Sequence, residues 1–186
     1  DRSYNGEIYN HLELRQELNK LKHIKWKSKT DTETILEMFE NYGINESLIR
    51  FKGMFAIAIW DNKKKLLSLV RDRFGEKPLF FGWASNSLVF ASELKAIIKS
   101  IHIKPQINIK AVSCFLRLSY IPAPLTIYEN IYKLGAGEKL EINKKGITES
   151  YLQQFEPERN HSNTRLTKWW KLSKSKEYQK KYSEQI

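Results

Sequence analysis

The sequence lacks several features that would assign it to a specialised class of protein. It has one cysteine, Cys114, and therefore neither an internal disulfide nor cysteines at metal-ligand spacing. No apolar run approaches the roughly 20 residues that span a bilayer, and the N-terminus lacks the basic-then-apolar layout of a signal peptide. Hydrophobic residues make up 41% of the 186 residues and aromatics 12%, which excludes wholesale disorder. We expect a globular, cytoplasmic chain with no membrane partner and no metal site.

Positive charge is abundant but unevenly placed. The net charge is +11, and residues 159–186 carry eight Lys or Arg against two Glu, which is more than half of the excess. A charged tail of this kind is more often a solvated linker or an exposed helix than a binding face. We therefore expect no nucleic-acid partner. Binding of nucleic acid by the tail stays open as an alternative, which a salt-dependent filter-binding assay decides.

Apolar spacing predicts two helices in the first quarter of the chain. Residues 9–22 repeat apolar side chains at near-helical intervals. Thr30 and Glu33 have the spacing of a capping box, and they predict a second helix that stops near Gly43. This start places Asp31 in the first helical turn, where exposed backbone N–H groups favour a carboxylate.

The middle of the chain changes to a strand pattern. Near-continuous apolar runs predict strands that are covered on both faces, and helices before and after them indicate an α+β arrangement of sheet layers enclosed by helices. A helix beginning at Asn108 is expected because Asn is a good N-cap. Beyond Phe155 the strand pattern is lost. The expected strands are residues 54–60, 66–70, 79–83, 88–90 and a closing hairpin of 140–142 with 147–151.

Four strings carry a family resemblance: NGEIYN from Asn5, GMFA from Gly53, RDRFGEKPL from Arg71 and FASELKA from Phe90. Alone, Asn5-Gly6 would be read as a tight turn. In this order, the strings closely resemble the N-terminal glutaminase domain of glutamine-hydrolysing asparagine synthetases, which are class II glutamine amidotransferases. The string YIPAPLTIY with IYKL fits the same branch. The resemblance covers residues 4–151, with two departures. Gly-Ala-Gly stands at 135–137 in place of a common Pro-Pro-Gly, and Lys29 stands near a position often occupied by a small residue.

The resemblance implies a fold and a division into domains. The fold is the four-layer αββα sandwich of N-terminal-nucleophile hydrolases, two antiparallel sheets between helices, incomplete here at the N-terminus because the chain begins at Asp1. Residues 1–152 would form the glutaminase domain. Residues 153–186 would be a basic linker and the start of a missing synthetase domain. ATP and Mg²⁺ would bind to that missing domain, and no cofactor is expected in the first.

The resemblance also implies site residues for L-glutamine. The nucleophile of the family is an N-terminal cysteine with its own α-amine as base, and this sequence does not contain it. Asn5, through its side-chain amide, and Gly6, through its backbone N–H, would stabilise the oxyanion. Glu7 and Asp31 would hold the substrate. From the residues alone, the alternative that Asp31 only stabilises the helix dipole stays open. Cys114 is expected to be a buried thiol rather than a substitute nucleophile.

Three hypotheses about function follow. The first is the glutamine-hydrolysing part of an ATP-dependent asparagine synthetase, with residues 1–186 inactive by themselves; a homodimer is compatible with it. The second is a paralogue of polysaccharide biosynthesis that amidates another acceptor. The third is a non-catalytic, degenerate glutaminase-like domain. Arg71, Asp72 and Arg73 are expected to support a loop near the site, although a surface ion-pair cluster is the alternative.

Overall fold

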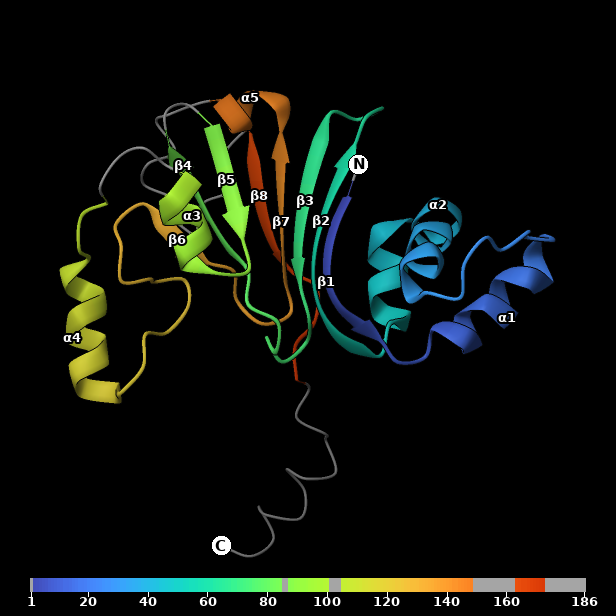
Figure 1. The fold of residues 1–186 in the computed structure, drawn as a ribbon, viewed down its shortest axis with the longest axis horizontal. Helices are drawn as coiled ribbons and strands as arrows, with labels where there is room; N and C mark the ends of the chain where they lie inside the picture. Colours follow the sequence, from blue (N-terminus) through green and yellow to red (C-terminus); the bar gives the residue numbers. More distant parts are fainter. Residues whose placement is uncertain (1, 85–86, 101–104, 149–162, 173–186) are drawn as a thin grey trace, which may run out of the picture.

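The computed structural model describes residues 2–84, 87–100, 105–148 and 163–172 as two antiparallel sheets enclosed by helices (Figure 1). The first sheet has the order β1-β2-β3-β7-β8 and the second the order β5-β4-β6. The strands of the first sheet are β1 (Arg2–Ile8), β2 (Gly53–Asp61), β3 (Leu66–Arg71), β7 (Glu138–Asn143) and β8 (Thr164–Lys168). Those of the second are β4 (Phe80–Ala84), β5 (Ser87–Ala91) and β6 (Ile131–Lys133).

Helices cover both outer faces. On one side of the molecule, α1 (His11–Leu21) and α2 (Asp31–Arg50) flank the first sheet, and α3 (Leu94–Ser100) and α4 (Ile109–Leu118) lie on the side of the second sheet (Figure 1). A short helix, α5 (Lys144–Thr148), follows β7. This order of helices, sheet, sheet and helices confirms the expected α+β, four-layer arrangement. In the part of the chain that the structure describes, no helix is both long and apolar enough to cross a bilayer.

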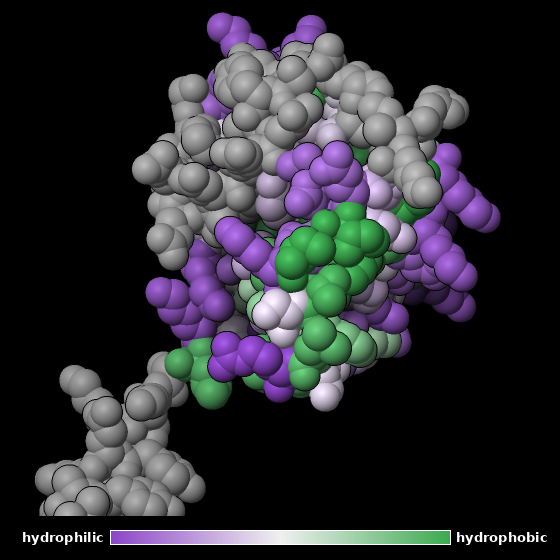
Figure 2. Space-filling model, turned by 90° about the vertical axis from the view of Figure 1, so that its left-hand side faces the viewer, coloured by the Kyte–Doolittle hydropathy of each residue, from purple (hydrophilic) through white to green (hydrophobic). Residues whose placement is uncertain are grey.

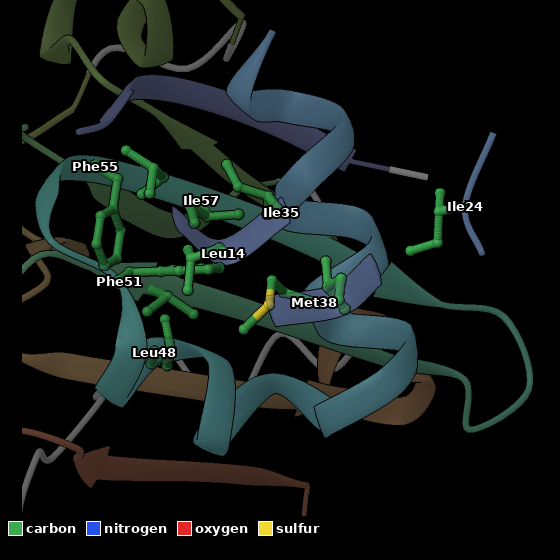
Figure 3. Close-up of a cluster of buried hydrophobic side chains, with 11 residues drawn as sticks. Leu14, Ile24, Ile35, Met38, Leu48, Phe51, Phe55 and Ile57 are labelled. Carbon is green, nitrogen blue, oxygen red and sulfur yellow. The ribbon is translucent and has the colours of Figure 1, made fainter. Parts of the chain in front are cut away.

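The core consists of two apolar clusters separated by the first sheet. Because successive side chains of a strand point to opposite faces, β2 sends Ala56 and Ala58 into the cluster between the sheets, and Phe55 and Ile57 toward the helices. Its continuous apolar sequence thus reflects burial on both faces, as expected. Figure 3 shows the cluster under the helices, which includes Leu14, Ile24, Ile35, Met38, Leu48 and Phe51.

The start of α2 differs from the expectation. Thr30 is the N-cap residue but makes no side-chain capping bond. Glu33 does not reach back to it; its carboxylate instead accepts hydrogen bonds from the backbone N–H groups of Lys27 and Ser28. The predicted capping box is therefore wrong, because the preceding loop takes the carboxylate. Gly43 does interrupt the helix, with φ 75°, but a further helical segment continues to Arg50.

The end of the first sheet also differs. The predicted hairpin is wrong in that Ile147 lies in α5, while residues 149–151 are outside the described residues. The strand that pairs with β7 is β8, with Ile142 opposite Thr164. The strand pattern therefore returns beyond Phe155, contrary to expectation. The expected boundary after residue 152 lies outside the described residues.

Trp169, the residue after β8, packs against the core. The Trp169 ring stacks on Phe55 with centroids 6.1 Å apart and 19° between the planes. Its Nε1–H donates to the backbone oxygen of Arg71 at 3.1 Å. Aromatic pairs of this kind contribute about 1 kcal/mol beyond the area they bury. The last strand thus contributes to the same core as β2.

Candidate active site

The edge strand β1 carries three of the four predicted site residues, and its hydrogen bonds give the direction of each backbone N–H. Tyr9 N–H, just beyond the strand, donates across to Lys52 O at 2.8 Å. Ile8 N–H donates in the opposite direction, to Asp31 Oδ2 at 2.9 Å. Because N–H directions alternate along a strand, the Gly6 N–H points away from β2, on the same side as that of Ile8. It is therefore directed out of the open edge of the sheet.

Position 6 accepts only glycine. A Cβ built there would lie 2.2 Å from the backbone oxygen of Met54 and 2.7 Å from Cα of Phe55, on the neighbouring strand. The backbone φ is +152°, a value that residues with a side chain rarely adopt. The close approach of β1 to β2 thus leaves the edge at position 6 free of any side chain.

Asn5 lies on the strand face opposite to Tyr4 and Ile8, which pack toward the helices. Its Nδ2 donates a hydrogen bond to Ser92 Oγ at 3.0 Å. Ser92 directly follows β5, so this bond joins the edge of the first sheet to the end of a strand in the second. An amide nitrogen has two hydrogens. The bond to Ser92 therefore orients the Asn5 amide and leaves one N–H for another acceptor.

Asp31, the first residue of α2, is hydrogen-bonded to two residues of β1. Its Oδ2 accepts hydrogen bonds from Tyr4 Oη at 2.6 Å and from Ile8 N–H at 2.9 Å, the residues on either side of the segment 5–7. Burial, and then the hydrogen bond to Asp31, raise the pKa of Tyr4 far above its ordinary value, so Tyr4 stays a donor. Asp31 Oδ1 receives a 3.4 Å contact from Thr32 Oγ1. A carboxylate has about four acceptor positions, and Asp31 can accept from a ligand as well.

Arg15 of α1 fixes the loop that leads into Asp31. Its guanidinium donates to Thr34 Oγ1 and to the backbone oxygens of Ser28 and Thr30, at 2.8, 2.8 and 2.7 Å. The guanidinium also lies 4.2 Å from the ring centroid of Trp26. A planar cation with five donors suits this task better than a lysine does. The position of Asp31 therefore depends on contacts from two helices.

Arg71 and Asp72, at the start of the RDRFGEKPL segment, are buried supports of the loop and not members of a surface ion-pair cluster. Asp72 is fully buried, and its carboxylate accepts four backbone N–H bonds, from Phe55, Phe74, Glu76 and Lys77. Arg71 donates to the backbone oxygens of Gly75, Lys77 and Leu134. Burial lowers the pKa of Arg71, although Asp72 and Glu138 oppose the change. This confirms the expected structural role and rejects the alternative.

The structure thus brings Asn5, Gly6 and Asp31 to one edge of the first sheet. Glu7 is exposed on the same strand, on the face of Asn5. Cys114 is half-buried on α4, so the expectation of a buried thiol is wrong. The described part of the chain has no group of three His, Cys, Asp or Glu that could hold a metal ion. The roles of the four residues toward glutamine stay predictions.

Two residues of this edge were missed from the sequence. Tyr4 directly precedes the NGEIYN string, and Ser92 is part of FASELKA. Neither string predicts the hydrogen bonds of these side chains. Ser92 and Asn5 are 87 positions apart, and only the pairing of the strands reveals their contact.

Comparison with known proteins agrees with the motifs. A family model described as a glutamine amidotransferase domain matches residues 3–155. A putative asparagine synthetase (glutamine-hydrolysing) 2 of Methanocaldococcus jannaschii is 41% identical over 152 residues, which are 80% of this chain and 28% of that protein. Asparagine synthetase (glutamine-hydrolysing) 2 of Bacillus subtilis is 41% identical over 146 residues, 75% of this chain and 19% of that protein. The chain therefore spans less than a third of these relatives.

Solved structures share the fold. The glutamine phosphoribosylpyrophosphate amidotransferase of B. subtilis is similar with a TM-score of 0.55 and 18% identity, covering 91% of this chain and 29% of that one. A second structure, an allosteric regulatory enzyme of purine biosynthesis, has a TM-score of 0.53, 22% identity and coverage of 78% and 26%. These likenesses show that the two-sheet sandwich has the fold of these two enzymes. With residues 3–155 matched and relatives 41% identical, the chain belongs to the glutamine amidotransferase domain family, in the branch of the glutamine-hydrolysing asparagine synthetases.

Proposed function

We propose that the open edge of β1 binds L-glutamine and that the longer protein hydrolyses its side-chain amide to supply ammonia for asparagine synthesis. One observation carries the proposal: the N–H of Gly6 points out of the open edge of β1, Asn5 precedes it in the same strand, and the Asp31 carboxylate is bonded to Ile8 N–H two residues further along that edge. Glutamine requires a hydrogen-bond acceptor for its α-ammonium group and two donors for its side-chain amide oxygen.

The spacing along the strand suits the ligand. The N–H groups of Ile8 and Gly6 are two residues apart, about 7 Å in an extended strand. An extended glutamine spans roughly 6 Å from its α-nitrogen to its amide oxygen, since its bonds are about 1.5 Å long. Asp31 would therefore accept from the α-ammonium while the amide oxygen lies near Gly6. Glu7, exposed on the same strand, would contact the substrate from the face of Asn5.

In this arrangement the residues of β1 act on the oxyanion. A cysteine thiolate attacks the amide carbon, and the carbonyl electrons move to the oxygen, which accepts hydrogen bonds from Gly6 N–H and the second N–H of Asn5. The carbon–nitrogen bond then breaks as the nitrogen takes up a proton, and ammonia leaves a thioester. Water attacks the thioester carbon, which releases glutamate and returns the thiol. Removing one oxyanion donor typically costs about 3 kcal/mol in the transition state.

Residues 1–186 do not contain that thiolate at the site. Their single cysteine, Cys114, is on α4, on the far side of both sheets from β1 (Figure 1). We therefore expect residues 1–186 alone to release no ammonia from glutamine. The asparagine-forming step would belong to another part of the longer protein, as the names of the relatives suggest. The family resemblance implies that ATP and Mg²⁺ would bind to that part.

The test is the rate of ammonia release from glutamine by the natural full-length protein. Asn5→Ala should lower kcat about 100-fold because one oxyanion donor is lost. Asn62→Ala, in the exposed turn after β2, is the matched control and should leave the rate unchanged. A full rate for Asn5→Ala would refute the role of this edge. Ammonia release by residues 1–186 above a heat-inactivated sample would refute the need for a further nucleophile.

A further inference from the structure

The open edge of β1 is polar, in contrast to the side of the molecule that carries α4. Figure 2 shows apolar side chains gathered on that side. Along β1, the side chains of Ser3, Asn5 and Glu7 are exposed and polar. A ligand that carries both charges, as glutamine does, therefore fits the β1 edge, where the Asp31 carboxylate is available for the cationic end.

The two oxygens of the Asp31 carboxylate have different surroundings. Oδ2 accepts hydrogen bonds from Tyr4 Oη at 2.6 Å and from Ile8 N–H at 2.9 Å. A carboxylate oxygen has about two acceptor positions, so these two donors occupy Oδ2. Among the described residues, Oδ1 has only the 3.4 Å contact with Thr32 Oγ1. Oδ1 is therefore the oxygen that can accept from a ligand.

The donors that bind Asp31 are neutral, so they leave its charge without a counter-charge. In the part of the chain that the structure describes, the ion pairs of Lys and Arg engage other carboxylates, those of Glu13, Glu17, Glu33, Glu37 and Glu141. Asp31 is partly buried. A charge that is partly removed from water is stabilised by an opposite charge nearby, and an ammonium group at Oδ1 would supply it.

Tyr4 is held in place independently of any ligand. Its ring packs against the apolar cluster under the helices, and its backbone lies opposite Ile57 of β2. Burial, followed by the hydrogen bond to Asp31, raises the pKa of Tyr4. Its hydroxyl therefore stays protonated and donates to Oδ2 whether or not the site is occupied.

We propose that Tyr4 is a positioning residue that binds Oδ2 of Asp31, turns Oδ1 toward the α-ammonium group of glutamine, and so makes the site selective for amides that carry this group. The inference rests on the proposed function, because it requires glutamine to bind at the β1 edge. Tyr4 itself does not touch the substrate in this arrangement. Its hydroxyl acts only through the carboxylate.

Kinetics of ammonia release by the natural full-length protein test this proposal. Tyr4→Phe should raise KM for glutamine roughly tenfold, as expected for the loss of a hydrogen bond to a charged group. It should leave kcat within about twofold, because the ammonium contact is the same in the ground state and the transition state. The monoamide of glutaric acid is glutamine without the α-ammonium group. Its inhibition constant against glutamine should not change in Tyr4→Phe.

The matched control is Tyr42→Phe. Tyr42 is also partly buried, and its Oη also donates to a carboxylate, that of Glu17, at 3.0 Å. This variant loses the same kind of bond away from the β1 edge, so it should leave KM and kcat unchanged. Asp31→Asn should raise KM further than Tyr4→Phe does. Adding Tyr4→Phe to Asp31→Asn should then have little effect, because both substitutions act on one contact.

Three results would overturn the proposal. The first is an unchanged KM for glutamine in Tyr4→Phe. The second is an equal weakening of glutamine and the monoamide, or a loss confined to kcat, since either would show a general structural role. The third is full additivity of Tyr4→Phe and Asp31→Asn. A failure of the proposed function looks different: the natural protein would release no ammonia from glutamine, or Asn5→Ala would keep the full rate.

Discussion

At the scale of single residues, the backbone around Gly6 leaves no space for a side chain. Gly6→Ala should lower the free energy of unfolding by more than about 3 kcal/mol, because the added Cβ meets strand backbone that cannot move aside. Gly43→Ala is the control: φ is also positive there, but nothing lies within 4 Å of its Cβ. It should cost only about 1–2 kcal/mol of backbone strain. Urea unfolding of both variants measures the difference, and equal losses would contradict the steric explanation.

Ser92 provides a second residue-scale prediction, because its hydroxyl orients the Asn5 amide. In the full-length protein, Ser92→Ala should lower kcat for glutamine about tenfold with little change in KM, since the lost bond acts on the oxyanion donor. Ser92→Thr keeps the hydroxyl and should restore most of the rate. If Ser92→Ala and Asn5→Ala have independent, additive effects, the contact between them does not contribute to catalysis.

At the scale of an element, the loop after β3 depends on one carboxylate. Asp72→Asn should destabilise the fold by about 3 kcal/mol, because an amide nitrogen would face backbone N–H donors in a buried place. Asp61, the last residue of β2, also accepts two backbone N–H bonds, but these bonds are exposed to solvent. Asp61→Asn should therefore cost less than about 1 kcal/mol. Thermal unfolding distinguishes the two, and similar losses would show that burial is not the cause.

The loop before α2 should respond to acid through Glu33. The N–H groups of Lys27 and then Ser28, together with Ser28 Oγ and Arg15, lower the pKa of Glu33 below its ordinary value of 4.5, against an opposing effect of burial. A depressed folded pKa means that this stabilisation is complete above pH 4.5 and is lost as the pH falls further. Glu33→Gln should therefore be less stable than the natural chain at pH 7 and converge with it at lower pH.

Urea midpoints between pH 7 and pH 3 measure this convergence. Glu40→Gln, on the exposed surface of α2, is the control and should follow the natural chain at every pH. A constant gap for Glu33→Gln across the range would show that the loop contacts do not depend on the charge of Glu33.

The elements differ in how well the sequence predicted them. Apolar runs located β2 to β5, because strands covered on both faces are nearly continuous in hydrophobicity. Asn108 marked the start of α4, because its cap is made within three residues. The prediction of a capping box was wrong because the Glu33 carboxylate binds the preceding loop. Arg15 holds that loop in position through its hydrogen bonds to the backbone oxygens of Ser28 and Thr30. β8 was not predicted because Thr164–Lys168 contains four polar residues and a single Leu, which is no apolar strand pattern.

The site shows the same division between local and distant information. The motifs identified Asn5, Gly6 and Asp31 as a group through resemblance alone. The direction of the Gly6 N–H follows from strand pairing, which no local pattern specifies. The bond from Asn5 to Ser92 and the bond from Tyr4 to Asp31 join positions 87 and 27 residues apart, so they depend on how the sheets and helices come together.

At the scale of the whole molecule, the folded unit extends beyond the family match, which ends at residue 155. A chain cut after residue 155 loses β8 and Trp169, which uncovers the edge of β7 and one side of Phe55. We expect it to melt at least 5 °C below residues 1–172 and to associate through the exposed strand edge. Circular dichroism and gel filtration of the two chains test this, and equal melting temperatures would contradict it.

The late position of β8 also bears on how the protein is made. A ribosome delivers the chain from the N-terminus, so β1, β2, β3 and β7 emerge before the strand that completes their sheet. Until Thr164–Lys168 has left the exit tunnel, the nascent chain keeps an unfinished edge beside β7. Synonymous codons that slow translation shortly after residue 143 would prolong that interval and raise the fraction of newly made chains captured by chaperones.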